Sequence, residues 1–198
     1  MNLPNKITLG RIIISIIILI LMIFPFYNIG YTFPKYLVMG RVVVNLKYII
    51  CGILFIIASV SDFFDGKLAR KHNLVTDFGK VTDAIADKIL VNGVLIIMAV
   101  DGVLPVVIPV VIITRDIIVD SIKMIAGSKG KVVAASIWGK IKTVCMMFGL
   151  SLLFFNNLPF ELLNFSLGYY LVIIACILSI YSGVQYFMAN KEFIIAKM

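Results

Sequence analysis

Six long apolar stretches, separated by short polar segments, constrain this chain more than any other feature of its sequence. They are residues 12–26, 42–61, 89–100, 103–125, 132–155 and 162–188. Most of them approach the roughly 20 residues that a helix needs to cross about 30 Å of hydrocarbon. The chain is 62% hydrophobic and only 14% charged, with a mean hydropathy of +1.09, which is more apolar surface than a soluble core of 198 residues can bury. The sequence therefore predicts an all-α integral membrane protein with six transmembrane helices.

The organisation along the chain is simple. No internal repeat or long linker interrupts it, so we expect residues 1–198 to form a single transmembrane domain. The first stretch follows Lys6 and Arg11 as in a signal peptide, but no small-residue cleavage site follows it, and we interpret it as the first transmembrane helix. The three cysteines lie singly inside apolar stretches, which is typical of packing residues. Small residues that would let helices approach closely are Gly52, Gly93, Gly139 and Gly149.

Lysine and arginine gather near one set of helix ends. That set contains Lys6, Arg11, Lys67, Arg70, Lys71, Lys80, Lys123, Lys129, Lys131, Lys191 and Lys197. The opposite set contains only Lys35, Arg41 and Lys47. Because cytoplasmic loops carry the excess of positive charge, both termini are predicted to be cytoplasmic in the cell membrane, and Lys129 and Lys131 need no further role. These loops also explain the formal net charge of +8, and no nucleic-acid motif is present.

Four aspartates lie where charge is costly, inside the predicted hydrocarbon layer or at its edge. At about 1.5 Å per residue from Lys47, taken as the outer end of the second span, Asp62 lies about 22 Å in and Asp65 about 27 Å in. From the outer end of the third stretch, Asp87 lies about 21 Å in and Asp83 about 27 Å in. Partners three or four residues apart point from one helix face. The four carboxylates can therefore converge at one depth.

Carboxylates gathered at one depth repel one another and take up protons unless cations neutralise them. Their oxygens suit Mg²⁺ or Mn²⁺, and four aspartates fit a two-metal site better than a site for one ion. The alternative is a set of structural salt bridges with Arg70, Lys80 and Lys88. Buried ion pairs stabilise a fold only weakly, so the sequence favours a metal site with the active site facing the cytoplasm.

Basic residues from two other stretches reach the same layer and predict a pocket for a phosphate group. These residues are Arg115, Lys123, Lys140 and Lys142. The planar guanidinium of Arg115 can donate two parallel hydrogen bonds to an oxyanion. The alternative for Arg115 is a structural ion pair with Asp116 or Asp120.

The run that begins at Asp62 reads DFFDGKLARKHNLVTDFGKVTDAIADK and resembles the signature of the CDP-alcohol phosphotransferase family. The matching positions are Asp62, Asp65, Gly66, Ala69, Arg70, Gly79, Asp83 and Asp87. The resemblance implies a six-helix membrane enzyme, usually a homodimer, with the first three aspartates as metal ligands and Asp87 as ligand or catalytic base. The residues it implies for binding the CDP-lipid are Thr8, Asp62, Gly66, Ala69 and Arg70.

Two further stretches concern the acceptor. LPNKITLGR near the N-terminus, and TRDIIVDSIK with AASIWGKIKT later, resemble the members of the family that use sn-glycerol 3-phosphate. The resemblance implies transfer of a phosphatidyl group from CDP-diacylglycerol to that acceptor, with release of CMP. The chain departs from the pattern at Asp116, where we expect Glu, and at Lys123, where Arg is common.

Other functions stay open from the sequence. Within the family, serine, an inositol phosphate or phosphatidylglycerol could be the acceptor. From another class, a divalent-cation transporter also carries intramembrane carboxylates, but it needs a polar path through the outer half of the bilayer. The charges of this chain gather in one half, which disfavours transport.

Overall fold

The structure is a computed structural model that describes residues 3–71, 76–128, 130 and 136–195, with the backbone alone described for residues 3–4, 63–71, 77–78, 80 and 192–195. Its helices are α1 (Leu3–Ile23), α2 (Leu46–Lys71), α3 (Asp77–Val100), α4 (Val107–Ser128), α5 (Ile137–Phe154) and α6 (Leu167–Ile195). Smaller elements are the strands β1 (Lys35–Val38) and β2 (Val42–Asn45) and the 3-10 turns η1 (Phe26–Ile29) and η2 (Phe160–Leu163). The predominantly helical fold predicted from the sequence is confirmed.

The second predicted stretch begins with a strand rather than a helix, so its prediction is wrong at its first four residues. Val42 pairs with Val38 in an antiparallel hairpin. The turn between them contains Gly40 with a φ of 69°, a value that glycine adopts without strain. Val42 and Val44 are buried while Val43 is exposed, and this alternation of β-branched residues favours a strand.

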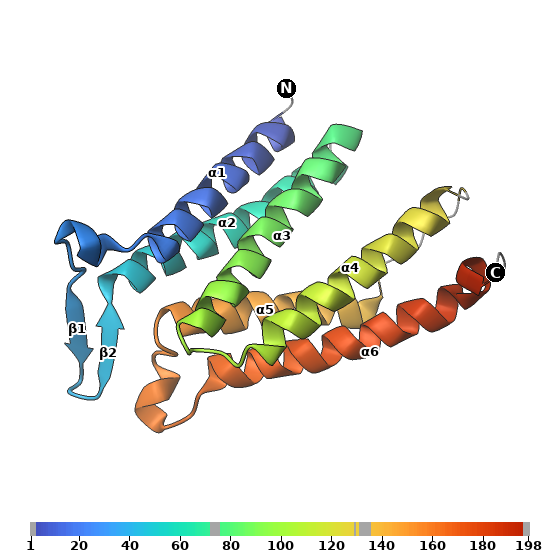
Figure 1. Cartoon of the computed structure of the whole chain (residues 1–198). Helices are drawn as coiled ribbons and strands as arrows, with labels where there is room; N and C mark the ends of the chain where they lie inside the picture. The colour runs from blue at the N-terminus through green and yellow to red at the C-terminus, as the bar shows by residue number, and fades with distance from the viewer. Residues whose placement is uncertain (1–2, 72–75, 129, 131–135, 196–198) are drawn as a thin grey trace.

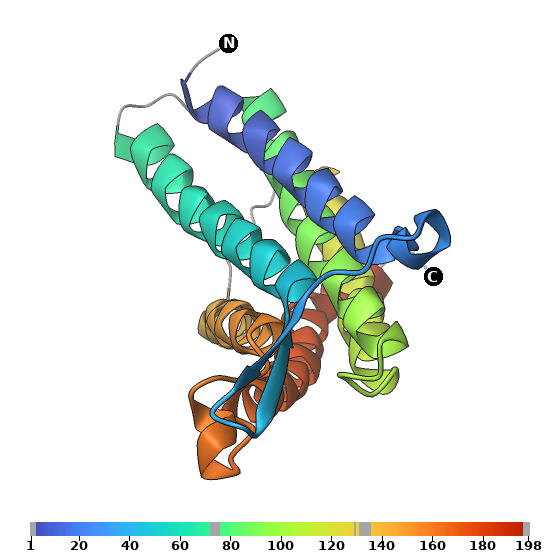
Figure 2. The same cartoon turned by 90° about the vertical axis from the view of Figure 1, so that its left-hand side faces the viewer.

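The helices form two groups. α1 packs against α2 and α3, whereas α6 packs against α5 and α4, and the groups meet where α2 reaches α5 and α3 reaches α4 (Figures 1 and 2). A Cβ at Gly93 would lie 2.5 Å from Leu19 Cδ2, and one at Gly149 would lie 2.8 Å from Val172 Cγ2. These glycines permit close approach, as predicted, and Gly52 does the same beside Phe154. The prediction for Gly139 is wrong, because the described atom nearest to a Cβ placed there belongs to the residue that caps the same helix, and not to a second helix.

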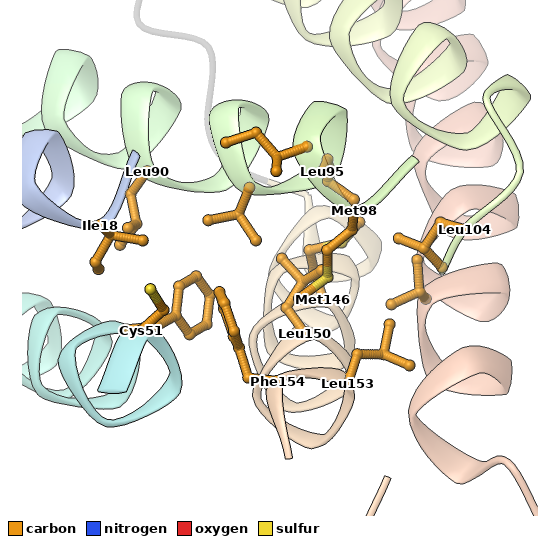
Figure 3. Packing of buried hydrophobic residues seen from close by; sticks show 14 of the residues in the cluster. Ile18, Cys51, Leu90, Leu95, Met98, Leu104, Met146, Leu150, Leu153 and Phe154 are labelled. Carbon is orange, nitrogen blue, oxygen red and sulfur yellow. The ribbon is translucent and has the colours of Figure 1, made fainter. Parts of the chain in front are cut away.

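The apolar core lies between the two groups, toward the hairpin end, where α2 begins and α3 ends. Figure 3 shows the packing of its side chains. Phe55 and Phe154 are fully buried there with ring centroids 5.4 Å apart, and Ile18, Met98 and Leu150 pack into the same cluster. Most of the buried polar side chains lie nearer the end with the chain termini. They include Thr8, Arg11, Thr82, Lys142, Ser182 and Asn190. The apolar core and most of the buried polar side chains therefore lie toward opposite ends of the molecule.

Three of the described helical segments are long and apolar enough to cross a membrane, by length and composition. They are Asn5–Ile23, Ile137–Phe154 and Leu167–Lys191. The other helices have 22 to 26 residues and carry the charges of the predicted sites. Both termini lie at one end of the helices and the hairpin lies at the other (Figure 1).

Candidate active site

One buried arginine joins carboxylates from two helices. Arg11 of α1 has a side chain that is only 2% exposed. Its Nη1 donates hydrogen bonds to the carboxylates of Asp62 on α2 and of Asp83 on α3, the second at 2.9 Å. The structure thus brings together two of the four predicted aspartates around a shared cation.

The start of α1 is held against the start of α3, which places Arg11 beside Asp83. Thr76 caps α3, because its hydroxyl accepts a hydrogen bond from Gly79 N at 3.0 Å. Asn5 Nδ2 donates to the same hydroxyl at 3.2 Å. A Cβ at Gly79 would lie 2.7 Å from Asn5 Oδ1, so a larger residue there would displace the Asn5 side chain from this junction.

Asp87 lies one helical turn beyond Asp83 on α3 and extends the acidic cluster toward a cavity. It interacts electrostatically with Asp62, Asp83 and Arg11. Thr8 is buried one turn before Arg11 on α1. The remaining residues predicted here lie on α2, and their side chains are outside those described: Asp65, Gly66, Ala69 and Arg70.

The carboxylates have the chemistry of a site for a hard cation. Asp62 and Asp83 offer oxygen ligands, and their side chains are 38% and 46% exposed. Among the side chains that the structure describes, no three His, Cys, Asp or Glu groups are grouped as metal ligands. The predicted set includes Asp65, which lies outside them. A metal ion would share Asp62 and Asp83 with Arg11.

A polar cavity of about 320 Å³ adjoins Asp87 between α3, α4, α5 and α6. All four cations predicted to hold the acceptor phosphate line it: Arg115, Lys123, Lys140 and Lys142. Lys88 also lines the cavity, together with the carboxylates of Asp116 and Asp120. Lys129 and Lys131 lie outside the described residues.

Asp116 holds two of these cations. Arg115 Nη1 donates to Asp116 Oδ1 at 2.9 Å, and Lys142 Nζ donates to the two carboxylate oxygens at 2.8 and 3.0 Å. Lys142 is 8% exposed and Asp116 is partly buried, so this ion network is largely shielded from solvent. Arg115 therefore forms the ion pair with Asp116 that the sequence offered as an alternative, and both residues line the cavity.

Arg115 is also anchored on α6. Its Nε donates to the carbonyl oxygen of Ser179 at 3.0 Å, and its Nη2 donates to Ser182 Oγ at 2.6 Å. A Cβ at Gly183 would lie 2.9 Å from Arg115 Cγ, so the glycine makes room for the arginine between α4 and α6.

The remaining lysines differ in how they are neutralised. Lys88 on α3 forms an ion pair with Asp120 on α4, not with the predicted metal ligands, and Lys123 Nζ lies 3.9 Å from the same carboxylate. Lys140 is exposed at the cavity and forms no ion pair with a described residue. Lys140 therefore differs from the other three, each of which lies within 4 Å of a described carboxylate.

An apolar groove of about 440 Å³ runs between α2 and α5 and ends at Asp62. Its walls include Ile56, Val60, Val144 and Phe148. The acidic cluster therefore borders an apolar groove through Asp62 and a cationic cavity through Asp87.

Comparison with known proteins agrees with this arrangement. A family model described as CDP-alcohol phosphatidyltransferase matches residues 1–181. The chain belongs to this family. A relative from Bacillus subtilis, named CDP-diacylglycerol–glycerol-3-phosphate 3-phosphatidyltransferase, is 41% identical over 191 residues, which cover 96% of each chain. A relative with the same name from Rickettsia bellii is 34% identical over 196 residues, which cover 97% of each chain. Another, from Haemophilus influenzae, is 32% identical over 195 residues, which cover 96% of this chain and 94% of the relative.

The sequence patterns missed two features of this family member's site. Arg11 is counted among the cytoplasmic charges and ends the LPNKITLGR stretch, but neither observation predicts that it is buried between Asp62 and Asp83. A possible signal was its place at the edge of an apolar stretch, where an unpaired charge is costly. The side chains from α6 that contact Arg115 had no such signal, since Ser182 and Tyr186 are ordinary residues of an apolar helix.

Proposed function

We propose that this chain transfers a phosphatidyl group from CDP-diacylglycerol to sn-glycerol 3-phosphate, giving phosphatidylglycerophosphate and CMP. The observation that carries the proposal is the position of the acidic cluster between an apolar groove and a cationic cavity. A lipid-borne diphosphate and a water-soluble phosphate can meet at such a junction. The relatives' printed names give the same donor and acceptor.

The apolar groove suits the lipid part of the donor. Acyl chains could lie between α2 and α5, and the diphosphate would then lie near Asp62, where the groove ends. Thr143 lines both the groove and the cavity, so the two spaces share one wall. The cytidine end would lie along α2, against Gly66 and Ala69, where small residues allow close approach, with Arg70 near the diphosphate and Thr8 on α1.

The cationic cavity suits the acceptor's phosphate. Its lining has five cations against three carboxylates, a surplus of two positive charges that matches a phosphate dianion. The N-terminus of α5, at Ser136 and Gly139, also lines the cavity and favours an anion. An uncharged acceptor such as inositol would leave that surplus unbalanced.

The reaction requires a hydroxyl to attack phosphorus in line with a leaving group. The primary hydroxyl oxygen of glycerol 3-phosphate attacks the phosphorus that bears the lipid, and the bond from that phosphorus to the oxygen bridging to CMP breaks. CMP leaves with the bonding electron pair, and Asp87 accepts the hydroxyl proton. The border position of Asp87, between the acidic cluster and the cavity, supports this role.

We assign Asp62, Asp65, Asp83 and Asp87 as the residues that would hold Mg²⁺ or Mn²⁺ in a two-metal site. A cation bound there would supply the positive charge that stabilises negative charge on the attacking and leaving oxygens. Arg11 would hold the carboxylates of Asp62 and Asp83 in place from the side of α1.

We also infer that all six helices cross the cell membrane, with both termini and the active site at the cytoplasmic face. The distribution of lysine and arginine along the chain supports this orientation. A homodimer is part of the proposal through the family resemblance alone.

The test is an acceptor panel. Purified protein in detergent would receive CDP-diacylglycerol with glycerol 3-phosphate, serine or inositol in turn, and CMP release would be measured. We expect release with glycerol 3-phosphate and background rates with the others. Release with serine or inositol but not with glycerol 3-phosphate would contradict the proposal.

A further inference from the structure

Tyr186 on α6 contacts the elements that supply the cations of the cavity. Its side chain is 7% exposed and lines the cavity. Its hydroxyl oxygen accepts a hydrogen bond from the backbone N–H of Ser136 at 2.9 Å. Ser136 caps α5, the helix that carries Lys140 and Lys142. Tyr186 thus fixes the start of α5 against α6.

The ring of Tyr186 also lies beside two cations of α4. Arg115 Cζ is 5.8 Å from the ring centroid, and Lys123 Nζ is 5.6 Å from it. Both distances are within the range of cation–π attraction. Lysine and arginine side chains have many rotamers, so a contact that restricts them reduces the entropy lost when they bind an anion.

We propose that Tyr186 is a positioning residue for the acceptor phosphate, which orders Arg115 and Lys123 through its ring and the start of α5 through its hydroxyl. This inference rests on the proposed function, because it assigns the cavity to a phosphorylated acceptor. Tyr186 takes no part in proton transfer or in binding the CDP-lipid. Tyr186 affects the affinity of the protein for the acceptor.

Two substitutions separate the contributions of the ring and the hydroxyl. Tyr186→Phe keeps the ring and removes the acceptor for Ser136 N–H, whereas Tyr186→Leu removes both. A matched control is Tyr181→Leu, because Tyr181 lies on the same helix and contacts α5 through Trp138, at 5.4 Å between centroids, without lining the cavity. All three variants lose a contact between α5 and α6.

Steady-state kinetics with each substrate varied in turn is the measurement. We expect Tyr186→Leu to raise the KM for glycerol 3-phosphate about tenfold, as the loss of two cation–π contacts predicts. The KM for CDP-diacylglycerol should change less than twofold. Tyr186→Phe should recover most of the acceptor affinity, and Tyr181→Leu should leave both KM values near wild type.

Other results overturn the proposal. It fails if Tyr186→Leu and Tyr181→Leu give the same KM for glycerol 3-phosphate, or if Tyr186→Leu weakens both substrates equally while lowering the melting temperature. Failure of the proposed function looks different, because the wild-type protein would then release no CMP with glycerol 3-phosphate. In that event, calorimetric titration of the wild type and Tyr186→Leu with inorganic phosphate tests the anion site directly, and equal affinities would refute the role of Tyr186.

Discussion

The two helix groups contain ion networks of opposite composition. In the first group, one buried cation, Arg11, bridges two carboxylates, Asp62 and Asp83. In the second, one carboxylate, Asp116, bridges two cations, Arg115 and Lys142. Each network therefore retains one unit of surplus charge, negative in the first and positive in the second.

Under the proposed function, this difference prepares the two regions for unlike ligands. A single counter-charge holds two like charges together without neutralising them fully, and removing that counter-charge would leave both like charges uncompensated in a partly dry environment. The surplus negative charge suits a divalent cation, and the surplus positive charge suits a phosphate. Asp87 lies where the two regions meet.

The largest expected effect comes from metal removal, which acts only on the acidic region. EDTA should abolish CMP release, and excess Mg²⁺ or Mn²⁺ should restore it, because the surplus carboxylates need cations to bind a diphosphate. Inorganic phosphate should not restore it. Full activity in a rigorously metal-free preparation would show that the acidic region needs no metal ion.

The next effect is that of Asp87→Asn, at the border between the regions. Loss of the general base should lower kcat by about 10²-fold to 10⁴-fold. Asp101→Asn is the control, because Asp101 ends the same helix at its far end and binds Tyr48. Turnover by Asp87→Asn near the wild-type rate would show that another group accepts the proton.

Arg11→Met breaks the acidic network at its centre. We expect it to lower the free energy of unfolding by about 2 to 3 kcal/mol, below the range for a fully buried pair because both carboxylates are partly exposed. Mg²⁺ should raise the melting temperature of this variant more than that of the wild type, since it replaces the missing positive charge. Arg41→Met is the control, because Arg41 is an exposed hairpin residue with no described ion pair. It should change neither the free energy of unfolding nor the response of the melting temperature to Mg²⁺. A variant as stable as the wild type would show that Arg11 is not the cation that holds the carboxylates.

Asp116→Asn breaks the cationic network in the same way and should have a similar or slightly smaller effect, about 2 kcal/mol. Here inorganic phosphate, not Mg²⁺, should restore the melting temperature, because an anion replaces the lost carboxylate. If either ligand rescued both variants equally, the two regions would not be specialised as described.

The sequence predicted much of this arrangement. The six apolar stretches located the six helices, and helical spacing predicted that the carboxylates of α2 and α3 converge, although by depth it set Asp62 level with Asp87 rather than with Asp83. Arg115, Lys123, Lys140 and Lys142 were grouped by depth alone, and the structure places all four around one cavity. These predictions succeed because the bilayer makes charge costly and helix geometry makes depth countable.

Other features depend on tertiary contacts that no local pattern encodes. Residues 42–45 were placed in a helix, although the turn at Gly40 and the pairing with β1 make them a strand. The partner of Asp62 and Asp83 was sought among nearby basic residues, whereas Arg11 lies 51 residues from Asp62 and 72 residues from Asp83 in the sequence. The role proposed for Tyr186 depends on contacts of its ring with Arg115 and Lys123 on another helix, and its hydroxyl bonds to Ser136, 50 residues away.

Lys140→Ala tests most directly whether the cationic region binds the acceptor phosphate, because Lys140 lines the cavity, is exposed and forms no ion pair with a described residue. Its removal should cost little stability, as should removal of the control Lys191, which is exposed on α6 away from the cavity. We expect Lys140→Ala to raise the KM for glycerol 3-phosphate about fivefold, as the loss of one solvent-exposed charge-assisted hydrogen bond predicts, with the melting temperature and the KM for CDP-diacylglycerol unchanged. An unchanged KM for glycerol 3-phosphate, or an equal rise in both KM values, would contradict the assignment of the cationic region to the acceptor.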